Sequence, residues 1–320
     1  MKTIQQSGLT QRKISSEELN PLVAVNDNHL LVATRPSNFG VFRQTDAGEL
    51  PSINAKSFRI TNSGTTAVVV TQKTPLLLRT FDTSIDINVD SNTIRLDTIN
   101  AYTPNGESSV LEVSHVGDSA AYEPIVTTEA FFGVQAYFKI TSIGWNGADN
   151  PDYAVKPFGI YTSKEAIDTN LPAFALGVRK DSSEVARFRS YAGIVQNDSL
   201  PLALLNRWYR INIEATASTS EFKVILYLEN PDKSGQWTQI YTDTITSTGT
   251  GMLDEIFNQN SFVIGIASDG IANQLIESLF VYKDVNGEEE LLPQTTKEYF
   301  CIHNLDEYRV SSEVTGYYTS

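Results

Sequence analysis

The chain has 320 residues, of which 41% are hydrophobic and 19% charged, so it has enough apolar material for a core and too little charge for a disordered chain. Its 24 basic and 38 acidic side chains give a formal net charge of −14, which repels phosphate backbones and anionic lipid headgroups. Apolar runs such as residues 67–70 are far shorter than the roughly 20 residues that a bilayer-spanning helix needs. We therefore expect a soluble globular protein that binds no nucleic acid and inserts into no membrane.

The single cysteine and the N-terminal residues indicate the cellular compartment in which the chain is made. Cys301 has no second thiol with which to form an intramolecular disulfide or a CxxC element. Residues 1–13 lack the apolar stretch of a secretory signal. We expect synthesis in a cytoplasm and stability that comes from packing.

Residues 1–56 are predicted to form an extended arm that docks to a partner. Short strands are expected at 30–33 and 40–43 and a helical turn at 15–19, with turn-forming residues between them. Residues 57–128 are predicted to form a hairpin-rich β region, or collar, with strands at 58–61, 66–71, 76–81, 84–89 and 93–99. Because apolar and polar residues alternate on both sides of a turn at 90–92, the last two strands are expected to pair as a hairpin.

Residues 129–283 carry the clearest pattern. Short segments rich in β-branched and aromatic residues alternate with Gly, Asn, Asp, Pro and Ser clusters, and one helical turn is expected at 252–258. The predicted strands are 131–143, 158–162, 173–179, 185–191, 208–216, 222–229, 237–245, 261–267 and 275–282. This spacing predicts an all-β fold, an antiparallel β-sandwich or barrel, of which we choose the antiparallel β-sandwich because of the resemblance described next. Residues 284–320 form a tail that opens with an Asn286-Gly287 turn and can add one strand within 299–318.

Several predicted strands in the second half of the chain contain aromatic residues in an order that resembles known proteins. The segments NRWYRINIE (206–214), FKVILYL (222–228), FVIGI (262–266) and IESLFVY (276–282), together with Trp237, resemble the concanavalin A-like and laminin-G-like jelly rolls over about residues 129–283. The resemblance implies a jelly-roll fold more than a function.

The organisation of the whole chain resembles a bacteriophage virion component. An acidic, nearly cysteine-free chain with an extended arm, a hairpin-rich region and a lectin-like sandwich is similar to a head or tail fibre, a receptor-binding protein or a decoration protein. The resemblance implies assembly in the host cytoplasm, other virion proteins as partners of the arm, and a homo-oligomer, with a trimer expected by analogy with fibres.

No catalytic signature is present. Glycosidases of the concanavalin A-like superfamily carry Glu-x-Asp-x-x-Glu on one strand, and this spacing does not occur in the chain. The three histidines, His29, His115 and His303, are far apart, and neither GxSxG nor GxxxxGK[ST] is found. We expect a protein that is not an enzyme.

Two acidic segments are candidate ligand sites. Asp86, Asn88 and Asp90 have the D-x-N-x-D spacing of a calcium loop, although an ordinary alternating strand produces the same letters. Ca²⁺ is the one cofactor that the sequence leaves open.

The second candidate is the loop 145–153, which combines aromatic rings that can stack on a sugar with oxygen-bearing side chains. The residues chosen for this glycan loop are Trp145, Asn146, Asp149, Asp152 and Tyr153. The alternative interpretation is an Asx-rich turn that Trp145 anchors to the core.

The sequence thus predicts a non-enzymatic structural or adhesion protein of a phage virion, of the fibre or decoration type, whose exposed sandwich contacts a host surface glycan during attachment. The alternatives are a stand-alone carbohydrate-binding lectin and a glycan hydrolase whose carboxylates the motifs do not reveal.

Overall fold

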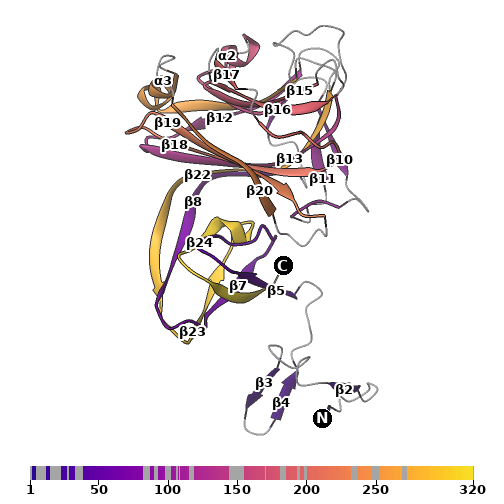
Figure 1. The fold of residues 1–320 in the computed structure, drawn as a ribbon, viewed down its shortest axis with the longest axis vertical. Coiled ribbons are helices and arrows are strands. Elements are labelled where there is room, and N and C mark those ends of the chain that lie inside the picture. The colour runs from indigo at the N-terminus through magenta and orange to yellow at the C-terminus, as the bar shows by residue number, and fades with distance from the viewer. Residues whose placement is uncertain are drawn as a thin grey trace.

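The computed structural model describes residues 2–4, 12–14, 23–26, 29–32, 39–81, 87–89, 93–97, 102–105, 107, 109–114, 119–143, 155–169, 171–180, 185–192, 195–197, 200–231, 237–246, 252–268 and 272–319. Antiparallel strands dominate these residues, and they build a large upper sandwich and a small lower sandwich (Figure 1). The predicted all-β class and antiparallel sandwich are confirmed.

Two facing sheets form the large sandwich, and one of them also extends into the small sandwich. One has ten strands in the order β20-β19-β18-β13-β22-β8-β24-β6, with β11 also paired to β22 and β10 to β11. The other has seven strands in the order β17-β16-β15-β14-β21-β12-β9. The ten strands are β20 (Trp237–Thr246), β19 (Glu221–Glu229), β18 (Trp208–Thr216), β13 (Phe131–Ile143), β22 (Ala272–Leu291), β8 (Val68–Thr80), β24 (Tyr308–Val310), β6 (Gly48–Glu49), β11 (Ser109–Ser114) and β10 (Thr93–Asp97). The seven strands are β17 (Val195–Asn197), β16 (Ala186–Ala192), β15 (Phe174–Lys180), β14 (Val155–Tyr161), β21 (Ser261–Ser268), β12 (Ser119–Val126) and β9 (Asn88–Val89).

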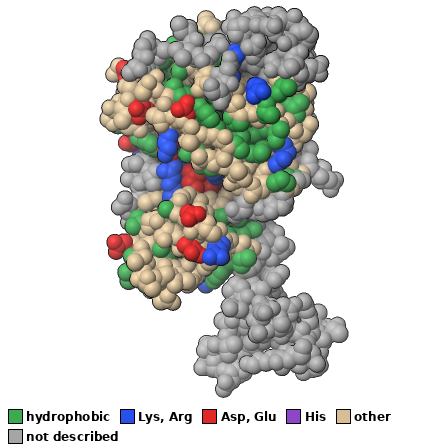
Figure 2. Space-filling model, in the orientation of Figure 1, with side chains coloured by type: hydrophobic (Ala, Val, Ile, Leu, Met, Phe, Trp, Pro, Cys, Tyr) green, Lys and Arg blue, Asp and Glu red, His purple; other side chains and the backbone are tan. Residues whose placement is uncertain are grey.

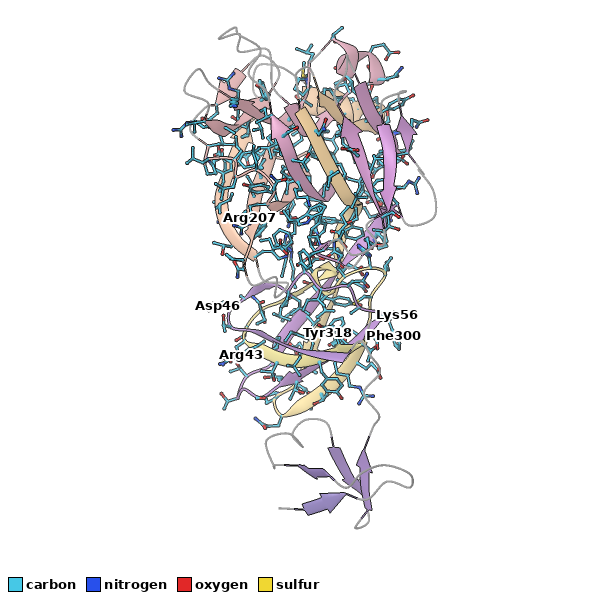
Figure 3. The ribbon with its side chains drawn as sticks, turned by 90° about the vertical axis from the view of Figure 1, so that its right-hand side faces the viewer. Arg43, Asp46, Lys56, Arg207, Phe300 and Tyr318 are labelled. Carbon is cyan, nitrogen blue, oxygen red and sulfur yellow. The ribbon has the colours of Figure 1, made fainter. Side chains whose placement is uncertain are left out.

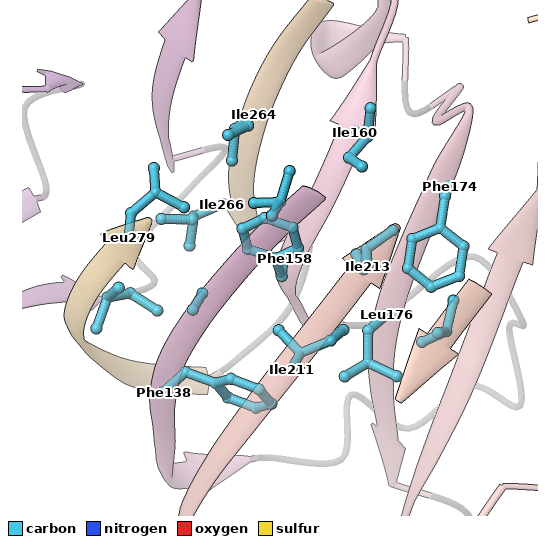
Figure 4. Close-up of a cluster of buried hydrophobic side chains, with 14 of the residues drawn as sticks. Phe138, Phe158, Ile160, Phe174, Leu176, Ile211, Ile213, Ile264, Ile266 and Leu279 are labelled. Carbon is cyan, nitrogen blue, oxygen red and sulfur yellow. The ribbon is translucent and has the colours of Figure 1, made fainter. Parts of the chain in front are cut away.

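Alternation of apolar residues explains the core between these sheets. On β13, Val134, Ala136, Phe138 and Ile140 point inward and are fully buried, because successive side chains of a strand point to opposite faces. They meet apolar side chains from β14, β15, β18, β21 and β22 (Figure 4). Each fully buried large apolar side chain stabilises the fold by about 1.5–3 kcal/mol relative to an exposed one.

The small sandwich is built on the far ends of two long strands. β22 and β8 run out of the large sandwich and continue, with β24 and β6, as one layer of the small one (Figure 1). The second layer is a four-stranded sheet in the order β23-β7-β25-β5. Its strands are β23 (Thr295–Phe300), β7 (Ser57–Asn62), β25 (Val314–Thr319) and β5 (Phe39–Gln44). Phe42, Phe58, Ile60, Val70 and Val310 belong to the core between these layers.

Charged side chains join the two sandwiches. Some of them are visible in Figure 2 as red and blue atoms between the upper and lower parts of the molecule. Lys73 of β8 is fully buried and lies with its Nζ atom 2.7 Å from Glu49. Arg210 of β18 pairs with Glu49 at 3.2 Å and with Asp306 at 3.0 Å. Tyr137 of β13 donates its hydroxyl proton to Asp306. The side of the ten-stranded sheet that points away from the large core is therefore tied to the small sandwich by buried polar contacts.

Helices are few and short among the described residues. They are α2 (Lys164–Asp168), α3 (Met252–Gln259) and the 3₁₀ turn η1 (Leu305–Glu307). The helical turn expected at 252–258 is confirmed as α3, whereas α2 was not foreseen. Neither helix has the length or the apolar character to span a membrane.

Two turn predictions are wrong. The strands expected at 84–89 and 93–99 do not form a hairpin, since β9 pairs with β12 in one sheet and β10 with β11 in the other. Asn286 and Gly287 lie inside β22, where the register against β8 shifts between Asn286 and Glu289. An Asn-Gly pair is as acceptable in a bulge as in a turn, so the dipeptide alone does not end a strand.

Strands from both ends of the chain complete the small sandwich. β5 and β6 come from residues before 57, and β23, β24 and β25 from residues after 283. The segments 66–71 and 76–81, expected as separate strands, are one strand, β8.

Four further strands lie nearer the N-terminus. β1 (Lys2–Ile4) pairs with β2 (Arg12–Ile14), and β3 (Val23–Asn26) pairs with β4 (His29–Val32). Among the described residues these four strands share no ladder with either sandwich.

Candidate functional site

The ligand sites predicted from sequence fall mostly outside the described residues. Trp145, Asn146, Asp149, Asp152 and Tyr153 of the glycan loop all do, so that loop stays a prediction.

The same holds for Asp86 and Asp90 of the calcium loop. Asn88 is described, is exposed and lies opposite Tyr122 in the pairing of β9 with β12. Within the part of the chain that the structure describes, no group of three or more His, Cys, Asp or Glu residues is placed to hold a metal ion.

A pocket of about 320 Å³ lies at the end of the small sandwich, between the β7–β8 loop and the turn from β24 to β25. Its volume is at the lower end of the range for small-molecule sites. Six of its eleven lining residues carry hydroxyl groups, and one carries a carboxylate. The lining residues are Thr61, Asn62, Ser63, Gly64, Thr65, Thr66, Val68, Ser312, Glu313, Val314 and Thr315. The pocket therefore presents groups that can both donate and accept hydrogen bonds.

A buried asparagine holds the wall of this pocket in place. Asn62 is fully buried, and its Nδ2 donates to the carbonyl oxygens of Thr66 and Leu291, both at 2.9 Å. Its Oδ1 accepts the backbone N–H of Gly64 at 3.0 Å, which closes an Asx turn. Gln294 donates from Nε2 to the carbonyl oxygens of Ser63 at 2.8 Å and of Gly64 at 3.1 Å. The loop is thus shaped by its own hydrogen bonds before any ligand arrives.

The exposed side of the four-stranded sheet begins at this pocket. We call it the outer face, and it comprises Thr296, Glu298 and Phe300 of β23, Ser57, Arg59 and Thr61 of β7, Thr315, Tyr317 and Thr319 of β25, and Val41 and Arg43 of β5. The alternate residues Phe58 and Ile60 point to the core and are buried. Arg43 of β5 and Phe300 of β23 lie at opposite edges of this sheet (Figure 3).

The charged side chains of the outer face are paired, one with the pocket residue Glu313 and two with each other. Arg43 donates to Glu313 from Nε at 2.9 Å and from Nη2 at 2.5 Å. Arg59 donates from Nη1 to the Tyr317 hydroxyl at 3.0 Å, and its Nη2 lies 3.4 Å from Glu298. The hydrogen bond to Tyr317 and the charge of Glu298 raise the pKa of the Arg59 guanidinium, so it stays cationic. These pairs are exposed and add at most about 1 kcal/mol each to stability, but they set the charge that a ligand meets.

Sequence reasoning missed this site because its two halves are far apart in the chain. Residues 61–66 look like an ordinary polar break between strands, and 312–315 lie in the expected tail. The pairing of Thr61 with Thr315 across β7 and β25 brings the halves together. The one signal in the sequence is the run of small hydroxyl residues at 61–66.

Comparison with known proteins yields matches among solved structures alone. No protein-family model and no curated protein sequence matches the chain. A peanut lectin with a bound 9mer peptide matches with 12% identity, 67% of this chain and 98% of the lectin covered, and a TM-score of 0.38. Lectin II from Ulex europaeus matches with 14% identity, 65% and 99% coverage, and a TM-score of 0.37. The lumenal domain of VIP36, in a form that holds Ca²⁺ and Man3GlcNAc, matches with 10% identity, 63% and 86% coverage, and a TM-score of 0.35. Similarity this distant does not extend to what the chain binds.

Proposed function

We propose that this chain is a non-enzymatic carbohydrate-binding protein and that its sugar site is the hydroxyl-lined pocket of the small sandwich. The observation that carries the proposal is a pocket lined by six Ser and Thr side chains, three of which lie on the β7–β8 loop that Asn62 holds by hydrogen bonds. Hydroxyl groups act as donors and as acceptors, which matches the hydroxyl groups of a sugar ring. A preformed loop also avoids the entropic cost of ordering side chains on binding.

Binding is favoured over hydrolysis by the carboxylates of the pocket. Glycosidases of the usual type use two carboxylates, about 5 to 9.5 Å apart, on either side of the scissile bond. Glu313 is the one carboxylate among the residues that line the pocket, and Arg43 engages it. The pocket therefore lacks the acid and base pair that hydrolysis requires.

Glycan-array screening of the full chain tests the proposal, followed by titration calorimetry with each glycan that is retained. Thr65→Val and Thr315→Val remove one exposed pocket hydroxyl each at nearly constant shape, so we expect each to weaken binding by about tenfold. Thr242→Val, on the exposed side of β20, is the matched control and should bind like the wild type. Retention of no glycan, or unchanged affinity in both pocket variants, would contradict the proposal.

We further propose that the protein acts as an adhesion component of a phage particle, assembled in the host cytoplasm as an oligomer, with its N-terminal segment as the attachment to other virion proteins. What supports this role is that β1 to β4 share no ladder with the sandwiches among the described residues. Mass spectrometry of purified particles tests it, and light scattering of the purified chain tests the trimer. Absence of the chain from particles would rule out this role and leave the carbohydrate site untouched.

A further inference from the structure

We infer that the sugar site extends from the pocket across the outer face to Phe300, so that the ligand is an extended oligosaccharide of several rings rather than a single sugar. This inference rests on the proposed carbohydrate-binding function.

The pocket and the outer face share residues. Thr61 and Thr315 line the pocket and also form, with Thr296 and Arg43, the first cross-strand row of the outer face. The next row contains Glu298, Arg59, Tyr317 and Val41, and the third contains Phe300, Ser57 and Thr319. Rows two residues apart along a strand are about 7 Å apart, so Phe300 lies about 14 Å beyond the pocket row. One sugar ring cannot reach both ends of this surface.

The rows combine polar and apolar groups in the way that a sugar chain does. Thr61 and Thr296 are linked by a hydroxyl hydrogen bond of 2.9 Å, as are Ser57 and Thr319. Phe300 is 71% exposed although it lies in a regular strand. Sugar rings carry apolar C–H faces edged by hydroxyl groups, so a ring can stack on Phe300 while its edges reach the neighbouring hydroxyls.

The charges of the surface indicate which sugars fit. Arg43 and Arg59 are each engaged by a carboxylate, so the pocket row and the middle row offer no unpaired cation to a sulfate or a sugar acid. Lys56, which directly precedes β7, lies near Phe300 at the far edge (Figure 3) and forms no ion pair among the described residues. We therefore assign uncharged rings to the first two rows.

Calorimetric titration of the full chain with neutral malto-, cello- and manno-oligosaccharides of one to six units tests the inference. Affinity in a series that binds should rise by about tenfold or more between one and four units, as the chain reaches Phe300. Phe300→Ser should remove this increase and leave monosaccharide affinity unchanged, whereas Thr315→Val should weaken binding at every length. Ile302→Ser, at a half-exposed apolar residue beyond β23, is the matched control and should change nothing.

A failure of the extended site gives a different result from a failure of the proposed carbohydrate-binding function. Binding that does not depend on chain length, with no effect of Phe300→Ser, would overturn the extended site and leave the pocket as a monosaccharide site. Binding of no oligosaccharide in any series, by a chain that retains other glycans on the array, would overturn the extended neutral site alone, whereas retention of no glycan on the array would overturn the proposed function. If Phe300→Ser instead lowered the mass of the protein by light scattering, without an effect on oligosaccharide affinity, the outer face would be a contact between copies of the chain.

Discussion

Glu49 is the residue on which the junction between the sandwiches depends most. Its carboxylate lies 2.7 Å from Lys73 Nζ and 3.2 Å from Arg210 and from Arg309, and Asn212 donates to it at 3.1 Å. Burial alone would raise the pKa of Glu49, but the three cations outweigh burial and hold the pKa well below its usual range. Burying a lysine ammonium group without a carboxylate partner costs far more free energy than leaving it exposed to water.

Replacement of this carboxylate tests its importance. We expect Glu49→Gln to lower the free energy of unfolding by about 3–5 kcal/mol, because Lys73 and Arg210 then remain buried without their common anion. Urea denaturation measures the change. Glu129→Gln, which breaks the exposed pair with Lys283, should cost less than about 1 kcal/mol. Equal losses in the two variants would contradict this interpretation of the junction.

Glu277 of β22 gives the protein a pH dependence of the opposite sign to that of Glu49. Its side chain is fully buried and accepts hydrogen bonds from the backbone N–H and the Nδ2 of Asn105, at 2.8 and 2.9 Å. Burial raises the pKa of Glu277 to about 8, since the partial compensation by its hydrogen bonds is smaller than the cost of desolvation. The folded state therefore binds this proton more tightly than the unfolded chain does.

This residue should destabilise the fold as the solution becomes more alkaline. Its stabilising contribution is complete below the ordinary carboxyl pKa and is lost as the pH rises through about 8. We expect the unfolding free energy of the wild type, minus that of Glu277→Gln, to fall steadily from about pH 5 to about pH 9, because only the wild type has this carboxyl group to ionise. Urea denaturation across this range measures it, with Glu129→Gln as the reference variant. A difference that stays constant, or that grows with pH, would contradict the assignment.

At the scale of elements, β14 and β21 fit together because two glycines leave room for one tyrosine ring. Gly159 and Gly265 are paired across the strands. A Cβ atom on Gly159 would lie 2.6 Å from Tyr161 Cε2, and one on Gly265 would lie 2.8 Å from the same atom. Tyr161 is fully buried and cannot swing into solvent at low cost.

A double-mutant cycle tests this packing. Gly159→Ala should lower the unfolding free energy by about 1–3 kcal/mol, because the added methyl group collides with the Tyr161 ring. In a Tyr161→Ala background the same substitution should cost less than about 0.5 kcal/mol. Thermal denaturation of the four proteins gives the coupling. Additive costs would mean that the ring does not occupy this space.

Individual strands were predictable from the sequence, whereas their partners were not. Enrichment in β-branched and aromatic residues between turn-forming clusters located β18 at 208–216 and β13 at 131–143 with the bounds that the structure has. Alternation of apolar and polar residues supported the strands at 84–89 and 93–99, but it carries no information on pairing, so β9 and β10 were assigned to one hairpin although they belong to opposite sheets. Long-range pairing depends on the fit of whole faces, which a local pattern does not contain.

At the scale of the whole molecule, two shared strands make the sandwiches one cooperative unit. β8 and β22 pair along their length through both sandwiches, and the Glu49 cluster ties the small sandwich to the ten-stranded sheet of the large one. Neither core can lose these strands without opening the other. Calorimetry should therefore record one unfolding transition for the described body. Two well-separated transitions would show that the sandwiches unfold independently.

The candidate site also depends on this large-scale arrangement. The sequence pointed to aromatic and acidic loops such as 145–153, where the chemistry is visible in one short segment. The pocket instead forms where residues about 250 apart in the chain are paired by β7 and β25, and its one local signal is the run of small hydroxyl residues at 61–66. Hydroxyl side chains are common at any surface, and only the register between distant strands gathers six of them.

The most direct test of the carbohydrate site is hydrogen exchange of the full chain with and without a saturating glycan taken from the array. We predict slower exchange of the backbone amides at 61–68 and 311–315, which surround the pocket, and at the neighbouring strands of the outer face when the glycan is an oligosaccharide. Protection confined to residues 144–154 would contradict this account and would place the sugar on the loop of Trp145 and Tyr153 instead.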